Sequence, residues 1–139
     1  MAAIKKERGE TKNIDLPVTP STAFSADSLV KFSSGKLVPC VAGDAAIDVV
    51  GIIRKAIVAA DADYTLDRTV PIEVPKEKHV EYEMEVGTGA IAATDKGTEY
   101  DLAGPTTVDQ SATTDKVVKL IRFKSSTKGV FWIKFNGSY

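Results

Sequence analysis

The stretch KHVEYEMEV, residues 78–86, alternates between apolar and charged side chains more cleanly than any other part of the chain. In an extended strand, successive side chains point to opposite faces, so the apolar and acidic residues separate onto two faces. The apolar face carries Val80, Tyr82, Met84 and Val86, and the opposite face carries Glu81, Glu83 and Glu85. The stretch therefore predicts a strand with one face in a core and the other in water or against a partner, at a sheet edge.

Further strands are predicted on both sides of this stretch, each a short run rich in β-branched and aromatic residues. They are SLVKF (28–32), KLVPCVA (36–42), DVVGIIRKAIV (48–58), DRTVPIEV (67–74), KVVKLIRF (116–123) and GVFWIKF (129–135). The first two flank Ser34-Gly35 and predict a hairpin, and Pro39 places the second at an edge or a bulge. The third is apolar on both faces, as in a fully buried strand, and Gly51 within it marks a bulge or a close approach.

The spacing of these segments determines the predicted fold class. Roughly seven to nine short strands, about ten residues apart, predict an all-β domain built as a small barrel or a sandwich. Residues 87–115 are rich in Gly, Thr and Asp and are interpreted as a long loop, and residues 54–64 could form one or two helical turns. No second core is visible, so we expect residues 27–139 to form a single β domain.

The first 26 residues differ in composition from the rest. Residues 1–13 are almost wholly polar, and Pro17 and Pro20 exclude a regular helix and remove two backbone donors. We interpret residues 1–26 as an extended arm, and a frayed terminus followed by a first strand is the alternative. Ile14, Leu16 and Val18 alternate as they would in an arm that adds a strand to the sheet edge of a partner.

Charge and cysteine content limit the function classes. Eighteen basic and nineteen acidic residues leave a formal net charge of −1, which argues against a protein that binds nucleic acid through its phosphates. Cys40 is the only cysteine, and neither a secretion signal nor a long apolar run is evident. We expect a soluble protein made in a cytoplasm, with no membrane partner.

Enzymatic chemistry has few candidate residues. His79 is the only histidine and, with period two, falls on the side of the glutamates, where a solvated side chain is expected. A pair of Cys40 and His79 is disfavoured because Cys40 lies in an apolar strand, where a thiol behaves as a small hydrophobe. No G-x-S-x-G elbow is present, and three glutamates along one strand do not converge as catalytic carboxylates do. We expect no enzyme activity.

No metal or cofactor is expected. The segment DADYTLD (61–67) spaces Asp61, Asp63 and Asp67 somewhat like a calcium loop. However, Leu66 stands where that loop needs glycine and Ile72 where it needs glutamate, so a capped turn explains the aspartates better. A zinc site would need more than one histidine and one cysteine.

The last two strands leave open a protein that binds single-stranded nucleic acid. They are aromatic and locally basic, as in platforms that stack single-stranded nucleic acid, with Trp132 and Phe131 beside Lys119, Arg122, Lys124, Lys128 and Lys134. Packing of Phe131, Ile133 and Phe135 into a core explains the aromatic residues without a ligand. The sequence favours this interpretation, and we expect no direct contact with nucleic acid.

Several segments together resemble the small β-rich decoration (cement) proteins of tailed-bacteriophage heads. The resemblance covers about three-quarters of the chain and is carried by three stretches and the closing strand pair. They are ADSLVKFSSGKLVPCVAGD (26–44), VVGIIRKAIVAAD (49–61), VGTGAIAATDKGTEYDL (86–102) and the strand pair that ends in GVFWIKF. The chain departs from the smaller decoration proteins in its long 87–115 section and its charged first thirteen residues.

The resemblance implies a virion structural protein with a β-barrel or β-tulip body on the outside of the expanded capsid, where it stabilises the shell against packaged DNA. The implied partners are the major capsid protein and neighbouring copies of the chain, as in a trimer at local three-fold positions. Residues 1–26 match the arm of such proteins, and its expected partner-binding residues are Lys5, Lys6, Arg8, Ile14, Leu16 and Val18. The alternative is a carbohydrate- or host-binding β module on the virion surface, for which Tyr64, Tyr100 and Tyr139 are the candidates.

Overall fold

The computed structural model describes residues 3–139, and nearly all of its regular structure is β. The strands are β1 (Lys5–Arg8), β2 (Thr11–Val18), β3 (Ser28–Ser33), β4 (Lys36–Pro39), β5 (Val49–Ile53), β6 (Arg68–Pro75), β7 (Glu81–Thr88), β8 (Glu99–Leu102), β9 (Thr107–Asp109), β10 (Val118–Ser125) and β11 (Lys128–Ile133). Two short 3₁₀ helices, η1 (Ala46–Asp48) and η2 (Ala93–Asp95), lie in the connections. The predicted all-β class is confirmed.

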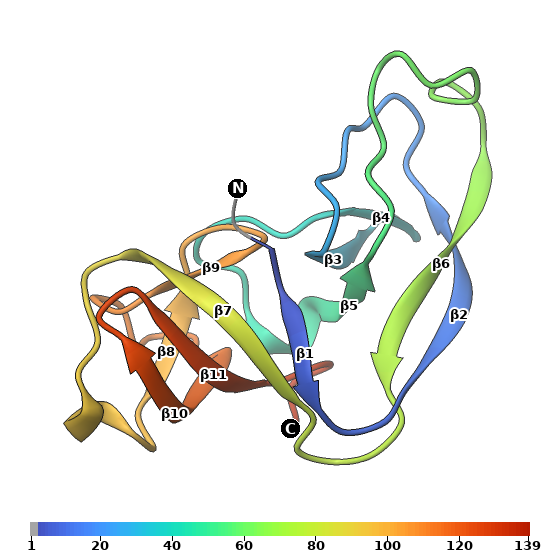
Figure 1. The fold of residues 1–139 in the computed structure, drawn as a ribbon. Helices are drawn as coiled ribbons and strands as arrows, with labels where there is room; N and C mark the ends of the chain where they lie inside the picture. The colour runs from blue at the N-terminus through green and yellow to red at the C-terminus, as the bar shows by residue number, and fades with distance from the viewer. Residues whose placement is uncertain (1–2) are drawn as a thin grey trace.

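The strands form two sheets that lie side by side, and each closes on itself (Figure 1). The N-terminal barrel has the order β2-β4-β3-β5-β6. The C-terminal barrel has the order β7-β11-β10-β8-β9 and is closed by a parallel pairing of β7 with β9, and β1 adds an outermost strand beside β7. Of the two architectures left open by the sequence, the structure has the barrel.

Strands β3 and β5 form a wall between two cores. In β5, Val49 and Ile52 belong to the larger core, whereas Val50 and Ile53 belong to the smaller core inside the N-terminal barrel. This explains why residues 49–53 are apolar on both faces and all buried. The prediction of a single core is wrong. The apolar run along residues 48–58 indicates burial on both faces of the strand, but it does not show that each face packs into a different core.

Gly51 provides the close approach that the sequence predicts. A Cβ atom there would lie 2.6 Å from the carbonyl oxygen of Glu73 and 2.7 Å from Cγ2 of Ile72. The register between β3 and β5 also shifts here, since Val30 faces Gly51 but Lys31 faces Val49. Both predicted features, a bulge and a close contact, are confirmed.

Two predicted connections differ from the structure. Residues 87–115 contain β8 and β9, which pair with each other, and β8 also pairs with β10. Their alternation was too short to stand out among the surrounding Gly and Thr residues. Residues 54–64 form turns rather than a helix, because Asp61 accepts a hydrogen bond from the amide of Val58 (3.0 Å).

Within residues 3–26, the predicted N-terminal arm is part of the body, and residues 1 and 2 of the predicted arm lie outside the described residues. β1 pairs with β7, and β2 pairs with β6 along all eight of its residues. Ile4 and Val18 are buried, with 1% and 0% of their surface exposed. The sheet edge that the arm was expected to join belongs to the chain itself, because Ile14 pairs with Ile72 and Leu16 with Val70 of β6. The structure thus has no separate extended arm within residues 3–26. Of the alternative, a frayed terminus followed by a first strand, the strand is present as β1 and β2.

None of the helices within residues 3–139 has the length and apolar character needed to span a bilayer.

Candidate functional site

The structure places five of the six predicted partner-binding residues at the surface of the two N-terminal strands. Lys5, Lys6, Arg8 and Ile14 are exposed and Leu16 is half-buried. Val18 is a correction: it has no exposed surface and packs in the smaller core, so it cannot contact a partner.

The three cations lie on β1, the outermost strand of its sheet. Lys5 and Lys6 form no ion pair within residues 3–139, and Arg8 meets Glu81 only at 3.9 Å. The Arg8 side chain is 73% exposed, so this ion pair contributes little stability. β1 therefore presents three positively charged side chains to solvent along one strand.

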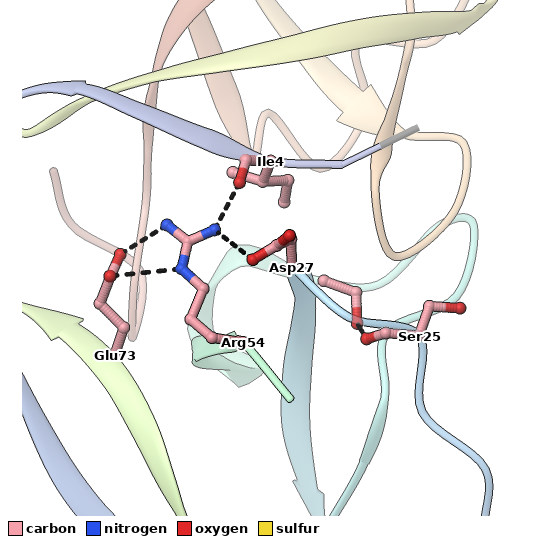
Figure 2. A network of polar contacts seen from close by, with 6 residues as sticks. Ile4, Ser25, Asp27, Arg54 and Glu73 are labelled. Carbon is pink, nitrogen blue, oxygen red and sulfur yellow. Dashed lines mark hydrogen bonds and ion pairs between the residues drawn. The ribbon is translucent and has the colours of Figure 1, made fainter. Parts of the chain in front are cut away.

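Arg54, just after β5, fixes the position of this N-terminal segment (Figure 2). Its guanidinium donates to the backbone oxygen of Ile4, to Oδ1 of Asp27 (3.1 Å) and to both carboxylate oxygens of Glu73 (2.8 and 3.3 Å). The amide of Ile4 also donates to the backbone oxygen of Asp27 at 3.0 Å. One side chain thus connects the start of β1 with β6 and the entry of β3.

The charged state of Arg54 is favoured by its partners. Burial opposes the charge, but the hydrogen bonds and charges of Glu73 and Asp27 outweigh it, so the pKa of Arg54 lies above its ordinary value. A bidentate pair of this kind also has a defined geometry. The exposed cations of β1 therefore project from a backbone that is held in place.

An open groove of about 490 Å³ lies beside β2. It is lined by Lys12, Ile14, Leu16, Phe32, Val50, Val74, Pro75, Glu77, Phe135, Asn136, Ser138 and Tyr139. Ile14 and Phe32 are 37% and 44% exposed, which is high for large apolar side chains facing a common hollow. The groove has the size of sites that hold ligands or short peptide segments.

The histidine beside the glutamates stacks on an aromatic ring. His79 is exposed, as predicted, but it precedes β7 with a φ of 63° and stacks on Trp132, with ring centroids 4.0 Å apart. Its predicted position within the strand is therefore wrong, because the left-handed backbone turns it out of the alternation.

Two of the three glutamates of β7 form ion pairs with cations of β10. β7 is flanked by β1, β9 and β11, so the prediction of an edge strand is wrong. Glu81 meets Arg122 at 2.9 Å and Glu83 meets Lys124 at 2.6 Å. The face that the sequence shows as acidic is thus an ion-paired surface between neighbouring strands.

Cys40 and His79 have different surroundings. Cys40 is fully buried in the larger core, and this burial raises the pKa of its thiol to about 12, with a further contribution from the charge of Asp44. A thiol with such a pKa is not a thiolate at neutral pH. The structure agrees with the interpretation of Cys40 as a small core residue.

The aspartates of residues 61–67 form a turn and ion pairs, as the sequence favours. Asp61 caps the turn at Val58, Asp63 pairs with Arg68 at 3.4 Å, and Asp67 pairs with Lys36. Residues 3–139 contain no group of three or more His, Cys, Asp or Glu side chains placed to hold a metal ion.

Three of the five cations named in the last strands pair with carboxylates of the same molecule. Arg122 and Lys124 pair with β7 glutamates, and Lys134 meets Glu99 at 2.7 Å. Lys119 lies over the Trp132 ring, with its Nζ 5.7 Å from the centroid. Phe131, Ile133 and Phe135 are buried in the larger core, which confirms the packing interpretation of this aromatic run.

The three tyrosines of the carbohydrate alternative do not form a common exposed surface. Tyr100 is 2% exposed, Tyr64 packs against the smaller core, and the Tyr139 hydroxyl donates to Glu99. Burial and the neighbouring Glu99 both raise the pKa of Tyr139. Only Tyr139 borders the groove.

Two residues of this surface were missed by sequence reasoning. Phe32 lies in the predicted strand 28–32 and Arg54 lies inside the predicted strand 48–58, and neither stands out there. No local pattern identifies them, because their roles depend on contacts with β2 and Ile4. The spacing of Pro71 and Pro75 was a usable signal, since two prolines four residues apart leave donors missing on one edge of a strand.

No protein-family model matches this chain, and comparison with curated proteins and with solved structures likewise finds no match.

Proposed function

We propose that this chain is a virion structural protein, a capsid decoration protein that binds the outer surface of a phage head and stabilises the shell against packaged DNA. The resemblance in the strand and turn sequences supports this assignment. The proposed partners are the major capsid protein and neighbouring copies of the chain at local three-fold positions, and the proposed location is the exterior of the virion.

The observation that carries the proposal is the arrangement of β1 and β2. The consecutive strands β1 and β2 carry the exposed cations Lys5, Lys6 and Arg8, followed by the exposed Ile14 and the half-buried Leu16. A surface that combines cations with exposed apolar side chains on a fixed backbone suits protein binding, because little ordering is needed on contact.

In this proposal, the affinity for the shell comes from many repeated contacts. Each contact with the shell can be modest, since capsid symmetry repeats it and contacts between neighbouring copies raise the effective concentration of each one. Cations on β1 would meet carboxylates of the shell, which gives the association a dependence on salt.

Co-sedimentation with emptied, expanded phage heads tests this proposal. The wild-type protein should bind saturably in a fixed ratio to the major capsid protein. The triple variant Lys5→Glu, Lys6→Glu, Arg8→Glu should bind at least about tenfold more weakly, because like charges would then face the shell.

The matched control replaces three exposed lysines elsewhere by glutamate and so reverses their charge. They are Lys55, Lys96 and Lys116, which form no ion pair within residues 3–139. It applies the same change in net charge and should bind as the wild type does. Equal weakening of both triple variants would mean that net charge, not the β1 surface, governs binding. Absence of wild-type binding would reject the proposed function.

A further inference from the structure

The strand β2 has an unpaired edge. Along one side it pairs with β6 over its whole length, whereas along the other side it meets β4 at a single pair, Val18 with Leu37. The N-terminal barrel is therefore closed at one end of β2 and open along residues 11–17. Figure 1 shows β2 and β6 as a long two-stranded ribbon that leaves the rest of the barrel.

The hydrogen bonds show which residues face this open edge. In an antiparallel pair, alternate residues bond to the partner strand and the others point away. The amide of Lys76 donates to the oxygen of Glu10 (2.9 Å), so the even-numbered residues bond to β6. The amide of Thr19 donates to the oxygen of Leu37 in β4 (3.0 Å), so the odd-numbered residues point to the open edge.

The prolines obey the same parity. Pro17, Pro71 and Pro75 all lie in odd-numbered pairs of the β2–β6 ladder, where no amide hydrogen is needed between the two strands. Within residues 3–139, the amides of Thr11 and Asn13, like that of Asp15, have no strand opposite them on this edge. The edge thus offers three donors and the matching carbonyl groups to an incoming strand.

The groove described above borders this edge on one face. The even-numbered side chains of β2 line it, opposite Phe32 of β3 and Val50 of β5. Free strand edges are commonly protected by charged side chains pointing inward. Here Lys12 lines the groove near the start of β2, whereas the apolar Ile14 and Leu16 line it further along the strand. Backbone donors and an apolar groove therefore occur together.

We infer that the β2 edge binds an extended segment of another polypeptide, which adds a strand beside residues 11–17. Such a segment needs apolar side chains at alternate positions to fill the groove. On its other face it needs a lysine or arginine, because Asp15 is exposed there and has no ion pair within residues 3–139. The identity of the polypeptide that supplies this segment rests on the proposed function, which makes it a segment of the major capsid protein.

A second copy of β2 does not have this pattern. An antiparallel pair of β2 edges related by a two-fold axis would bring odd-numbered residues opposite one another, with Asp15 facing Thr11 or Asn13 and no cation on that face. On the groove face, Lys12 would oppose Ile14 or Leu16. Neither face gains a complementary charge, so the inferred occupant is a different chain.

A synthetic peptide tests the edge without any capsid. The probe is the acetylated, amidated heptapeptide Lys-Val-Thr-Ile-Lys-Val-Thr, in which apolar residues alternate with polar ones. At saturation it should slow amide hydrogen exchange of Thr11, Asn13 and Asp15 by at least about tenfold. The same peptide N-methylated at its polar residues should not bind, because it cannot donate to this edge. Failure of the unmethylated peptide to protect these amides would overturn the inference.

A matched pair of variants tests the edge on the full protein. Asn13→Pro removes one outward donor and leaves the β6 ladder intact, as Pro17 already does, whereas Asn13→Ala removes the side chain but keeps the donor. We expect Asn13→Pro to weaken peptide binding at least about fivefold relative to Asn13→Ala. Ile14→Glu should weaken it as well, and Val58→Glu, on an exposed apolar residue outside the groove, should not.

The capsid experiment separates the two proposals. If wild-type protein binds expanded heads and Asn13→Pro binds them as well as Asn13→Ala does, the edge is not the contact and the inference is wrong while the proposed function stands. If the peptide protects the edge but heads are not bound, the proposed function fails and the edge site stands. Concentration-dependent protection of the same amides without peptide would assign the edge to a second copy and overturn the inference.

Discussion

At the scale of single residues, the fold depends on one position with no room for a side chain and on two buried apolar residues near the N-terminus. Gly51 lets β6 pass close to β5, and Val18 and Ile4 place the N-terminal strands in the two cores. These contacts convert a polar N-terminal segment, which could not fold alone, into part of both barrels.

Gly51→Ala should lower the free energy of unfolding by about 2 kcal/mol, because the new methyl group would meet the backbone of Glu73 rather than a movable side chain. Gly104→Ala is the matched control. Its Cβ would have Thr107 Oγ1 as its nearest neighbour, at 3.4 Å, and its stability should change by no more than about 0.5 kcal/mol. Urea denaturation of the two variants measures the difference, and equal stabilities would contradict the close approach.

At the scale of elements, the strands themselves were easier to predict than the pairing between them. The hairpin of β3 and β4 was visible in the sequence, because a short turn with Gly35 separates two apolar runs. So were β5, which is a continuous apolar run, and β6, β7, β10 and β11, whose patterns extend over six or more residues. β8 and β9 were missed because they have four and three residues.

Pairing between distant strands was beyond sequence reasoning. β1 and β2 each match the pattern of an edge strand, and that pattern is the same whether the sheet belongs to a partner or to the chain itself. The candidate site was predictable to the same extent: the exposed residues of β1 and β2 were identified, but the groove was not. It depends on Phe32, Val50 and the C-terminal residues, which the barrel brings together.

The contact between β1 and the N-terminal barrel depends on Arg54. Arg54→Met should lower the free energy of unfolding by about 2 kcal/mol, since Glu73 and Asp27 would lose a partly buried partner. Lys36→Met breaks the pair with Asp67, whose side chain is 77% exposed, and should cost no more than about 0.5 kcal/mol. Thermal unfolding compares them, and an equally small effect for both would show that Arg54 does not join these elements.

The C-terminal residues and β8 are joined by a carboxylate that titrates. Hydrogen bonds from Lys134 and Tyr139 hold the pKa of Glu99 below its ordinary value of 4.5. Its stabilising contribution is therefore present above the ordinary pKa and lost as the pH falls through the folded-state pKa. At pH 7 Glu99→Gln should be less stable than the wild type by no more than about 1 kcal/mol. The difference measured by urea denaturation should shrink near pH 3, and a difference that is independent of pH would contradict this pair.

At the scale of the whole molecule, two barrels share a wall, and the N-terminal strands run along both. The N-terminal segment cannot be removed as an independent arm, because β2 forms one side of a barrel. Its proposed binding role must therefore be tested by surface substitutions. A body of this kind suits the proposed function of covering and joining neighbouring surfaces, since the proposed binding residues are ordered before contact.

Under the proposed function, adding the protein to DNA-filled heads that lack it should raise the temperature at which they release DNA. Binding to the intact shell alone stabilises that state by mass action. The β1 triple variant should give a smaller rise than the control variant with Lys55, Lys96 and Lys116 reversed. Release at the same temperature with and without wild-type protein would contradict a stabilising role.

The most direct measurement is an electron cryo-microscopy reconstruction of expanded heads incubated with the purified protein. The account predicts density for both barrels on the outer surface of the shell, with residues 5–17 in contact with the major capsid protein. Heads that remain bare at saturating protein concentration, or that bind the molecule with β1 and β2 facing solvent, would contradict it.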